Sequence, residues 1–466
     1  MRLSVTFPLV GVVFIIFTSI YSLSNLEVGN FSLPAPALYI PSFYRLSEPE
    51  LVWKYKTWEK ENWRNDSITL PPPEFRNESV FTAGATVCYA SGSKYTDSQA
   101  KGQCVCRRNY FGESCGIPSS VWFNDVTKRY DIKLRSKPRR IIQALIVNQE
   151  FDFFESRVEE HWDSVDVFLI GESSFTARGD EKETLFFQKL KSGWLSKYQH
   201  KILYVYLDFF HKKGKGDGWF ADSFPRKYLG KHGLPRIHGL EDDDIIVYND
   251  ADEIPNRETI EFLKYFQGFP EPINFLYRWT VFGYYWLAIN EKGEDQNGRL
   301  HCIHISAAAD HCNFKVSAAG TWKLVHNIFN DSFWSIRQKL HKKAKYAKSI
   351  AEQNITVESW TIGSVGHYAG YHCSWCMPIP GIQNKLISAQ SDDGPRWGDY
   401  PEKVEPDFIE NIRESGTWFD LVSKFRLIEF APSYVLKNFN KFKDIIVPPS
   451  NLNPVPSNLS HPESNL

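Results

Sequence analysis

The sequence predicts an α/β protein whose central sheet is mostly parallel and carries a ligand site along one edge. Two observations predict it. Short runs of β-branched and aromatic residues at 141–147, 167–170, 202–207 and 245–248 read as buried strands, and the stretch at 150–162 between the first two has helical spacing. Acidic or hydroxyl residues collect at the ends of these runs, and in parallel sheets ligands bind at the carboxyl ends of the strands.

The segment 245–255 is the most informative one. Its apolar run ends in Asp250 and Asp252, so both carboxylates are expected at a strand's carboxyl end. Two aspartates one residue apart could hold a divalent cation together with diphosphate oxygens of a substrate. An acidic helix N-terminus, favoured by the helix dipole, is the alternative. Pro255 suits a first helical turn, and apolar residues continue at helical spacing through Phe266.

Composition narrows the function. A chain of 466 residues can hold about three domains, or one large α/β domain with appendages. Its 54 basic and 55 acidic residues give a net charge of -1, so no overall field attracts nucleic acid, and we expect no nucleic-acid partner.

The N-terminus predicts a membrane anchor. Residues 3–26 carry no charged side chain. This uncharged segment is long enough to span a bilayer, which takes about 20 residues. We therefore expect an anchor at 5–23. The positive charge of Arg2 predicts that the tail at 1–4 is cytoplasmic and that the rest of the chain is luminal. A cleaved signal peptide ending near Ser22 or Ser24 is the alternative, but no clear cleavage site follows.

Residues 24–83 are rich in proline, serine and asparagine and predict a glycosylated stem. Tryptophans recur there every five residues, which predicts packing of part of the stem against the body: Trp53, Trp58 and Trp63. An even cysteine count of eight and six glycosylation sequons favour a secretory compartment. The sequons are at Asn30, Asn65, Asn77, Asn330, Asn354 and Asn458.

A small cysteine module is expected at 84–118. Its second half, Cys104–Cys115, resembles the C-terminal half of an EGF-like domain. The whole module has four cysteines, where a full EGF-like module has six. The resemblance implies that Cys106 pairs with Cys115, which leaves Cys88 with Cys104. A zinc site is the alternative, although the segment contains no histidine.

The body of the chain, at 138–445, is similar to the bisecting N-acetylglucosaminyltransferase family, also called N-acetylglucosaminyltransferase III. The similarity extends from about Cys88 to about Lys443 and is weakest between Asn290 and Ser359. Five motifs carry it in one order: Glu172–Gly179, Asp217–Asp222, Asp250–Pro255, His367–Cys376 and Ser388–Tyr400.

The resemblance implies a Golgi type II membrane enzyme with a GT-A-like fold. It implies inverting transfer of N-acetylglucosamine from UDP-GlcNAc, through a β1,4 link, to the core β-mannose of N-glycans, with Mn²⁺. The family's acidic motif corresponds to Asp250 and Asp252, which would bind that metal. Late histidines often add a metal ligand in GT-A-type enzymes, which makes His367 and His372 candidates.

The donor and the proton acceptor have further candidates. Asp217 and Asp222 around Trp219, together with Glu172, are expected to line the donor site; a polar loop with a buried tryptophan is the alternative. Arg396 could hold diphosphate oxygens. Inverting transfer needs a carboxylate that accepts the proton of the acceptor hydroxyl, and the candidates are Asp393, which we prefer, and Asp399.

Four cysteines remain in the body. Cys373 and Cys376 have the spacing of a thioredoxin-type motif, but no thioredoxin-like order of elements surrounds them. A structural disulfide is favoured, formed either by these two with each other or with Cys302 and Cys312.

Three other functions stay open. The protein could transfer N-acetylglucosamine to a different glycan, or it could be a catalytically silent, membrane-anchored glycan-binding or adhesion protein. A thiol oxidoreductase built on Cys373 and Cys376 is the third. The tail at 446–466 is expected to be disordered.

Overall fold

The computed structural model describes residues 58, 60–75, 78–288, 313–339, 344–353, 355, 357–364, 366–390, 396–421, 425–428 and 430–448. Contacts separate Met1–Lys54 from Tyr55–Leu466, and all described residues belong to the second unit. The expected anchor at 5–23 lies outside the described residues, as does the tail beyond 448. Within the described part of the chain, every helix is too short or too polar to cross a bilayer.

One half of the main sheet is parallel. Its strands are β7 (Ile141–Ile146), β8 (Val167–Ser173), β9 (Ile202–Leu207) and β11 (Ile245–Tyr248), in the order β11-β7-β8-β9. All four predicted strands are therefore present. Since β11 joins β7 on the side away from β8, the order reverses between β7 and β11, and that reversal is where open α/β sheets bind ligands.

The other half of the sheet is mixed. Beyond β11 come β16 (Asn313–Thr321), β14 (Glu271–Val281), β18 (Gly370–Ser374) and β12 (Glu253–Pro255). β16 runs antiparallel to both β11 and β14, whereas β18 is parallel to β14 and antiparallel to β12. The expectation of a mostly parallel sheet thus holds for the first half only, because β16 pairs antiparallel with both of its neighbours, β11 and β14.

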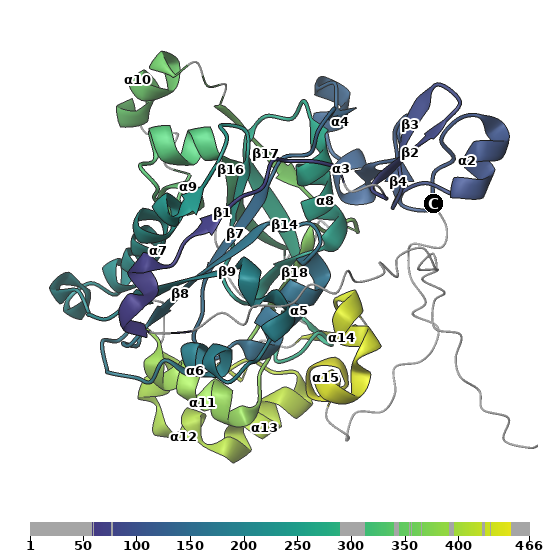
Figure 1. Ribbon diagram of the computed structural model, residues 1–466. Helices are drawn as coiled ribbons and strands as arrows, with labels where there is room; N and C mark the ends of the chain where they lie inside the picture. Colours follow the sequence, from purple (N-terminus) through teal and green to yellow (C-terminus); the bar gives the residue numbers. More distant parts are fainter. Residues whose placement is uncertain are drawn as a thin grey trace, which may run out of the picture. The chain divides into compact units, whose positions relative to one another are not determined.

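Helices cover both faces of this sheet (Figure 1). α7 (Gly218–Gly233) and α9 (Phe333–Arg337) lie together on one side, and α5 (Phe151–His161) and α8 (Arg257–Tyr265) lie on the other. The strands between them are apolar on both faces, as expected for buried parallel strands.

The helix expected from Pro255 begins two residues later. Pro255 is the last residue of β12, and Asn256 caps α8 by accepting a hydrogen bond from the Thr259 amide, 3.1 Å from Oδ1. An asparagine side chain satisfies a free amide at a helix start, which proline cannot do. Phe266, at the other end, leaves the helix and enters β13 (Phe266–Gln267).

A helical layer closes the C-terminal part. α11 (Ile379–Ser388), α12 (Pro401–Val404) and α13 (Pro406–Ser415) pack together around a second apolar cluster that includes Trp286 and Phe419. In this layer, α11 lies at the same edge of the sheet as the acidic segment, because Lys385 of α11 contacts Asp252.

The cysteine module contains β2 (Val80–Ala83), β3 (Thr86–Tyr89) and α2 (Tyr95–Lys101). Disulfides join Cys88 to Cys104 and Cys106 to Cys115, the pairing that the EGF-like resemblance implied. The module packs on α8, where the Tyr89 hydroxyl donates to Glu261. Because both pairs are disulfides, these cysteines form no zinc site.

Part of the expected stem packs on the body. Trp58 and Trp63 are buried, and the Trp58 indole donates to Gln199 Oε1 at 2.9 Å. β1 (Ile68–Thr69) then pairs in parallel with β10 (Ile237–His238). The prediction that stem tryptophans pack on the body is confirmed for these two, and Trp53 lies outside the described residues.

Two expected glycosylation sites, Asn65 and Asn330, are exposed. The other four, Asn30, Asn77, Asn354 and Asn458, lie outside the described residues, as do Cys302 and Cys312. The remaining helices and strands are η2 (Lys60–Asn65), β4 (Tyr110–Phe111), β5 (Ile117–Pro118), α3 (Ser119–Trp122), α4 (Val126–Arg129), β6 (Lys133–Leu134), α6 (Leu185–Lys191), η3 (Ser196–Lys201), η4 (Lys212–Lys215), η5 (Leu234–Arg236), β15 (Trp286–Leu287), η6 (Leu324–Ile328), α10 (Ala344–Glu352), β17 (Val357–Ile362), η8 (Trp397–Asp399), β19 (Arg426–Leu427), α14 (Ser433–Lys437) and α15 (Phe439–Ile446).

Candidate active site at the carboxyl end of β11

The acidic segment forms a tight loop between β11 and β12. The buried Arg157 of α5 fixes its backbone: one guanidinium nitrogen donates to the carbonyls of Asp250, Ala251 and Glu253, at 2.9, 3.1 and 2.6 Å. The two hydrogens of this nitrogen are shared among the three carbonyl oxygens, which therefore face Arg157. The carboxylates of Asp250 and Asp252 are therefore presented at the edge where the strand order reverses.

Two arginines surround Asp250. Arg226 of α7 donates to both carboxylate oxygens, at 3.0 and 3.1 Å, and Arg337 of α9 donates to Oδ2 at 2.8 Å. Burial raises the pKa of Asp250, but the two guanidinium groups outweigh burial and hold that pKa well below its usual range. Asp250 is therefore ionised and already paired with cations.

The same arginines extend the network in both directions. Arg226 also pairs with Asp222, at 2.5 Å, and Arg337 also binds both oxygens of Glu253, which is buried. Asp222 belongs to the segment expected at the donor site. The structure thus connects that segment to the acidic loop through Arg226.

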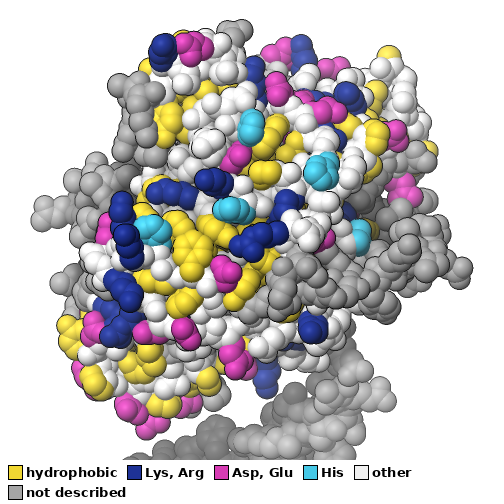
Figure 2. Space-filling model, turned by 60° about the vertical axis from the view of Figure 1, so that its left-hand side comes forward, with side chains coloured by type: hydrophobic (Ala, Val, Ile, Leu, Met, Phe, Trp, Pro, Cys, Tyr) yellow, Lys and Arg dark blue, Asp and Glu magenta, His cyan; other side chains and the backbone are white. Residues whose placement is uncertain are grey.

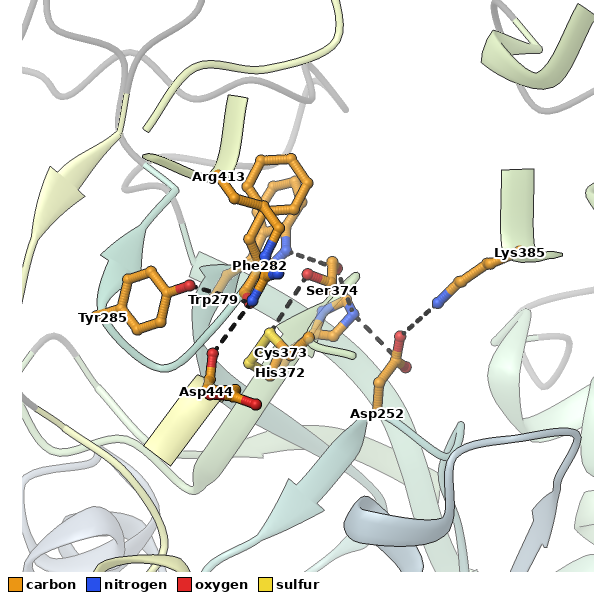
Figure 3. Close-up of a disulfide and its surroundings, with 11 residues drawn as sticks. Asp252, Trp279, Phe282, Tyr285, His372, Cys373, Ser374, Lys385, Arg413 and Asp444 are labelled. Atoms are coloured by element: carbon orange, nitrogen blue, oxygen red, sulfur yellow. Dashed lines mark hydrogen bonds and ion pairs between the residues drawn. A yellow bond between two sulfur atoms is a disulfide. The ribbon is translucent and has the colours of Figure 1, made fainter. Parts of the chain in front are cut away.

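Asp252 has different partners. Lys385 of α11 lies 3.1 Å from Oδ2, and the His372 ring nitrogen Nε2 lies 3.8 Å from Oδ1. Figure 3 shows the Asp252 carboxylate between these two side chains. Burial raises the pKa of Asp252, whereas Lys385 and His372 lower it, and the lowering prevails.

His372 is held as a neutral imidazole. Burial lowers its pKa, and Asp252 opposes this effect without cancelling it. The Trp279 indole donates to Ser374 Oγ at 2.9 Å, and Ser374 Oγ lies 3.1 Å from His372 Nε2, so the serine hydroxyl can donate its hydrogen to Nε2. In that arrangement the single lone pair of Nε2 accepts the serine hydrogen, so Nε2 could bind a metal only after the Ser374 hydroxyl turns its hydrogen elsewhere.

The spacing of Asp252 and His372 allows both side chains to bind one divalent ion. Two atoms that each lie about 2.1 Å from one ion are at most about 4.2 Å apart, and 3.8 Å between Asp252 and His372 satisfies this limit. Both carboxylate oxygens of Asp250, in contrast, accept hydrogen bonds from arginines. Among the described residues, no three histidine, cysteine or acidic side chains come together as a complete metal site, so substrate oxygens would have to supply the remaining ligands.

His367 lies apart from this cluster. Its ring stacks on Phe123 with centroids 4.4 Å apart, and its backbone pairs with Ser364. It precedes β18 at the strand's opposite end from Asp252, because β18 runs from Gly370 to Ser374. Of the two candidate histidines, the structure brings only His372 to Asp252.

The expected donor residues divide into two groups. Glu172 is buried; it accepts from the amides of Phe186 and Phe187, at 2.9 and 3.0 Å, and from the Tyr204 hydroxyl, at 2.7 Å. Burial raises its pKa, although these donors oppose the rise. Its carboxylate therefore anchors the start of α6, and its oxygens are already hydrogen-bonded.

The segment at 217–222 forms the first turn of α7. Asp217 caps the helix by accepting from the Phe220 amide at 2.9 Å, and Trp219 is 51% exposed. The alternative of a buried tryptophan in a polar loop is wrong, because the indole faces solvent. On the face around α7, hydrophobic, lysine, arginine and histidine side chains lie side by side (Figure 2).

Arg396 caps a helix in this structure. It donates to the carbonyls of Ile387 and Ala389 at the C-terminal end of α11 and pairs with Asp399. Cations commonly bind the free carbonyls of a helix end. Asp399 is 58% exposed, and Asp393, the preferred proton acceptor, lies outside the described residues.

Cys373 and Cys376 form a disulfide with each other, and both are buried. The disulfide lies at the end of β18, directly after His372, and it is fixed by the Asp252 carbonyl accepting from the Cys373 amide at 3.0 Å. A buried disulfide that supports the site explains this motif without redox chemistry. Of the pairings left open by the sequence, the structure shows Cys373 bonded to Cys376.

Four site cations were missed in the sequence: Arg157, Arg226, Arg337 and Lys385. Arg226 could have been found, since it follows Asp222 at the i,i+4 spacing of a helical ion pair. Nothing in the local sequence of Arg337 or Lys385 indicates that either meets the acidic loop, because 87 and 133 residues separate them from their partners.

The mixed α/β sheet with helices on both faces is a glycosyltransferase-like fold. Residues 119–307 match the family model described as glycosyltransferase family 17. A protein of Rattus norvegicus named β-1,4-mannosyl-glycoprotein 4-β-N-acetylglucosaminyltransferase is 34% identical over 353 residues, which cover 74% of this chain and 62% of the relative.

Relatives of the same name in Mus musculus and Homo sapiens are 33% and 34% identical, over 74% and 73% of this chain. The resemblance to the N-acetylglucosaminyltransferase III family, first drawn from five motifs, is confirmed. The chain spans about three fifths of the length of these relatives, 62% of the rat protein and 61% of the human one.

Proposed function

We propose that the protein transfers N-acetylglucosamine from UDP-GlcNAc to the core β-mannose of N-glycans, through a β1,4 link and with inversion. One observation carries the proposal: carboxylates and cations converge at the carboxyl end of β11, where the strand order reverses. Such an edge binds nucleotides in open α/β sheets. The names of the relatives support the sugar and the acceptor.

Asp252 and His372 are proposed to hold a divalent metal, Mn²⁺ by family resemblance, with diphosphate oxygens of the donor completing its ligands. The bound metal would neutralise the negative charge that develops on the departing UDP. Asp250 is assigned a different role, which is to fix Arg226 and Arg337 beside the site. This division follows from the partners of each aspartate.

Asp393 remains the proposed acceptor of the proton from the mannose hydroxyl, and Asp399 is the second candidate. The exposure of Asp399 and its pairing with Arg396 favour Asp393. Replacing Asp393 by Asn is expected to lower turnover far more than UDP-GlcNAc affinity. An equal loss of affinity would reject the assignment.

The test of the function is product analysis. The purified full-length protein is incubated with UDP-GlcNAc, Mn²⁺ and a biantennary N-glycan, and the linkage and anomer of any new residue are determined by NMR. We expect a single β1,4-linked residue on the core β-mannose. A residue at another position would support the alternative acceptor, and absence of both transfer and UDP-GlcNAc binding would support a glycan-binding protein.

A further inference from the structure

Lys385 pairs with the same carboxylate, Asp252, that a bound cation would use. Its ammonium lies 3.1 Å from Oδ2, while Oδ1 faces His372 at 3.8 Å. Asp252 thus lies between a lysine on one side and a candidate metal ligand on the other, as Figure 3 shows. A cation that binds the carboxylate must compete with the positive charge already there.

Lys385 is held less tightly than the arginines on Asp250. Its side chain is 30% exposed, against 14% for Arg226 and 12% for Arg337. Each arginine pairs with two carboxylates, whereas Lys385 pairs with one, Asp252, and its ammonium lies 5.2 Å from the centroid of the Trp375 ring. A lysine is also a compact charge on a flexible four-carbon stem, which can turn from one partner to another.

The backbone that carries Lys385 is fixed at the ligand edge. Gln149, just after β7, donates to the Gly381 carbonyl at 2.8 Å and accepts from Asn384 at 3.1 Å. These two bonds attach α11 to the carboxyl end of β7, the strand beside β11. The root of the side chain is therefore anchored there, and only its ammonium has to move to meet a ligand at this edge.

We propose that Lys385 exchanges partners when the donor binds. Without nucleotide it neutralises Asp252; with the nucleoside diphosphate sugar bound it leaves Asp252 to the metal and binds a diphosphate oxygen, where it balances the charge of the leaving group. This role rests on the proposed function and adds to it a specific phosphate-binding residue. It also explains why a buried carboxylate can stay ionised before metal and donor arrive.

The exchange predicts two affinity changes of opposite sign in Lys385→Met. Mn²⁺ affinity without nucleotide, measured by electron paramagnetic resonance, rises severalfold because no lysine competes for Asp252. UDP affinity in the presence of Mn²⁺, measured by calorimetry, falls about tenfold because a charged hydrogen bond to phosphate is lost. Lys403→Met is the matched control: Lys403, on the neighbouring α12, donates to the Phe419 carbonyl.

Three results would overturn the proposal: both affinities of Lys385→Met within twofold of wild type, both lowered together with the melting temperature, or no Mn²⁺ binding by wild type and variant alike. Lys385→Arg is expected to retain most of the UDP affinity. Failure of the proposed function is a separate result, since wild-type protein that transfers no N-acetylglucosamine can still show the two opposite shifts.

Discussion

Glu253 shows why the arginines of this site matter for stability as well as for function. Its side chain is 1% exposed, and Arg337 binds both of its oxygens. A carboxylate taken out of water is costly unless a cation and hydrogen bonds compensate it. Arg337 supplies that compensation to Glu253 and Asp250 at once, so both carboxylates depend on one side chain.

Replacing Arg337 by Met should therefore destabilise the protein by about 3 to 5 kcal/mol, because a buried charge loses its partner. The free energy of unfolding is measured by urea titration. The control is Arg129→Met, which breaks an arginine–glutamate pair of the same chemistry at the surface, with Glu358, and should cost little. Equal effects of the two substitutions would contradict the assigned role of burial.

For individual residues, the sequence could predict where the acidic side chains of the site lie, but not which cations pair with them. Asp250 and Asp252 were expected at the strand end because an apolar run precedes them directly. The cations on them come from positions 24, 87 and 133 residues away, and such distant pairs leave no local pattern. Glu172 and Arg396 are predicted to bind the donor, and in this structure they satisfy the free backbone groups of two helix ends.

Among the elements, α5 couples the stability of the site to pH. His161, near its end, is fully buried, with Nε2 2.9 Å from the Pro255 carbonyl, and burial together with Arg157 lowers its pKa to about 3. The unfolded chain takes up a proton at this histidine below about pH 6.5, and the folded protein does not until about pH 3. The folded state is thus penalised as pH falls within that window.

Between pH 6.5 and about 3, His161 should lower the free energy of unfolding by about 1.4 kcal/mol for each pH unit of acidification. Urea titrations at several pH values test this. His161→Gln should reduce the slope by that amount, whereas His238→Gln, at an exposed position of β10, should leave it as in wild type. An unchanged slope in His161→Gln would show that this histidine does not carry the effect.

The strands divide into those that local sequence predicts and those that it does not. β7, β8, β9 and β11 are mostly apolar and buried, since helices cover both faces of the sheet. β14 and β16 lie apart in the sequence, and their antiparallel pairing depends on contacts between distant residues. The parallel half was therefore predictable, and the mixed half was not.

Although the net charge of the whole molecule is only -1, many charged side chains are concentrated at the site. Asp222, Asp250, Asp252 and Glu253 meet Arg226, Arg337 and Lys385 at one edge of the sheet, so the site is close to neutral before any substrate binds. Under the proposed function, a donor diphosphate brings negative charge to a place where two of these cations, Arg226 and Arg337, are already fixed. Fixed charges of this kind need little rearrangement during transfer.

The central claim is that Asp252 serves the donor, and Asp252→Asn tests it most directly, because the substitution keeps the size of the side chain and removes its charge. GlcNAc transfer and UDP-GlcNAc affinity in Mn²⁺ are measured together, with Asp243→Asn, a partly exposed carboxylate paired with Arg135, as the control. We predict at least about a hundredfold loss of transfer with weakened donor binding in Asp252→Asn and neither in the control. Transfer and affinity at wild-type levels in Asp252→Asn would contradict the account.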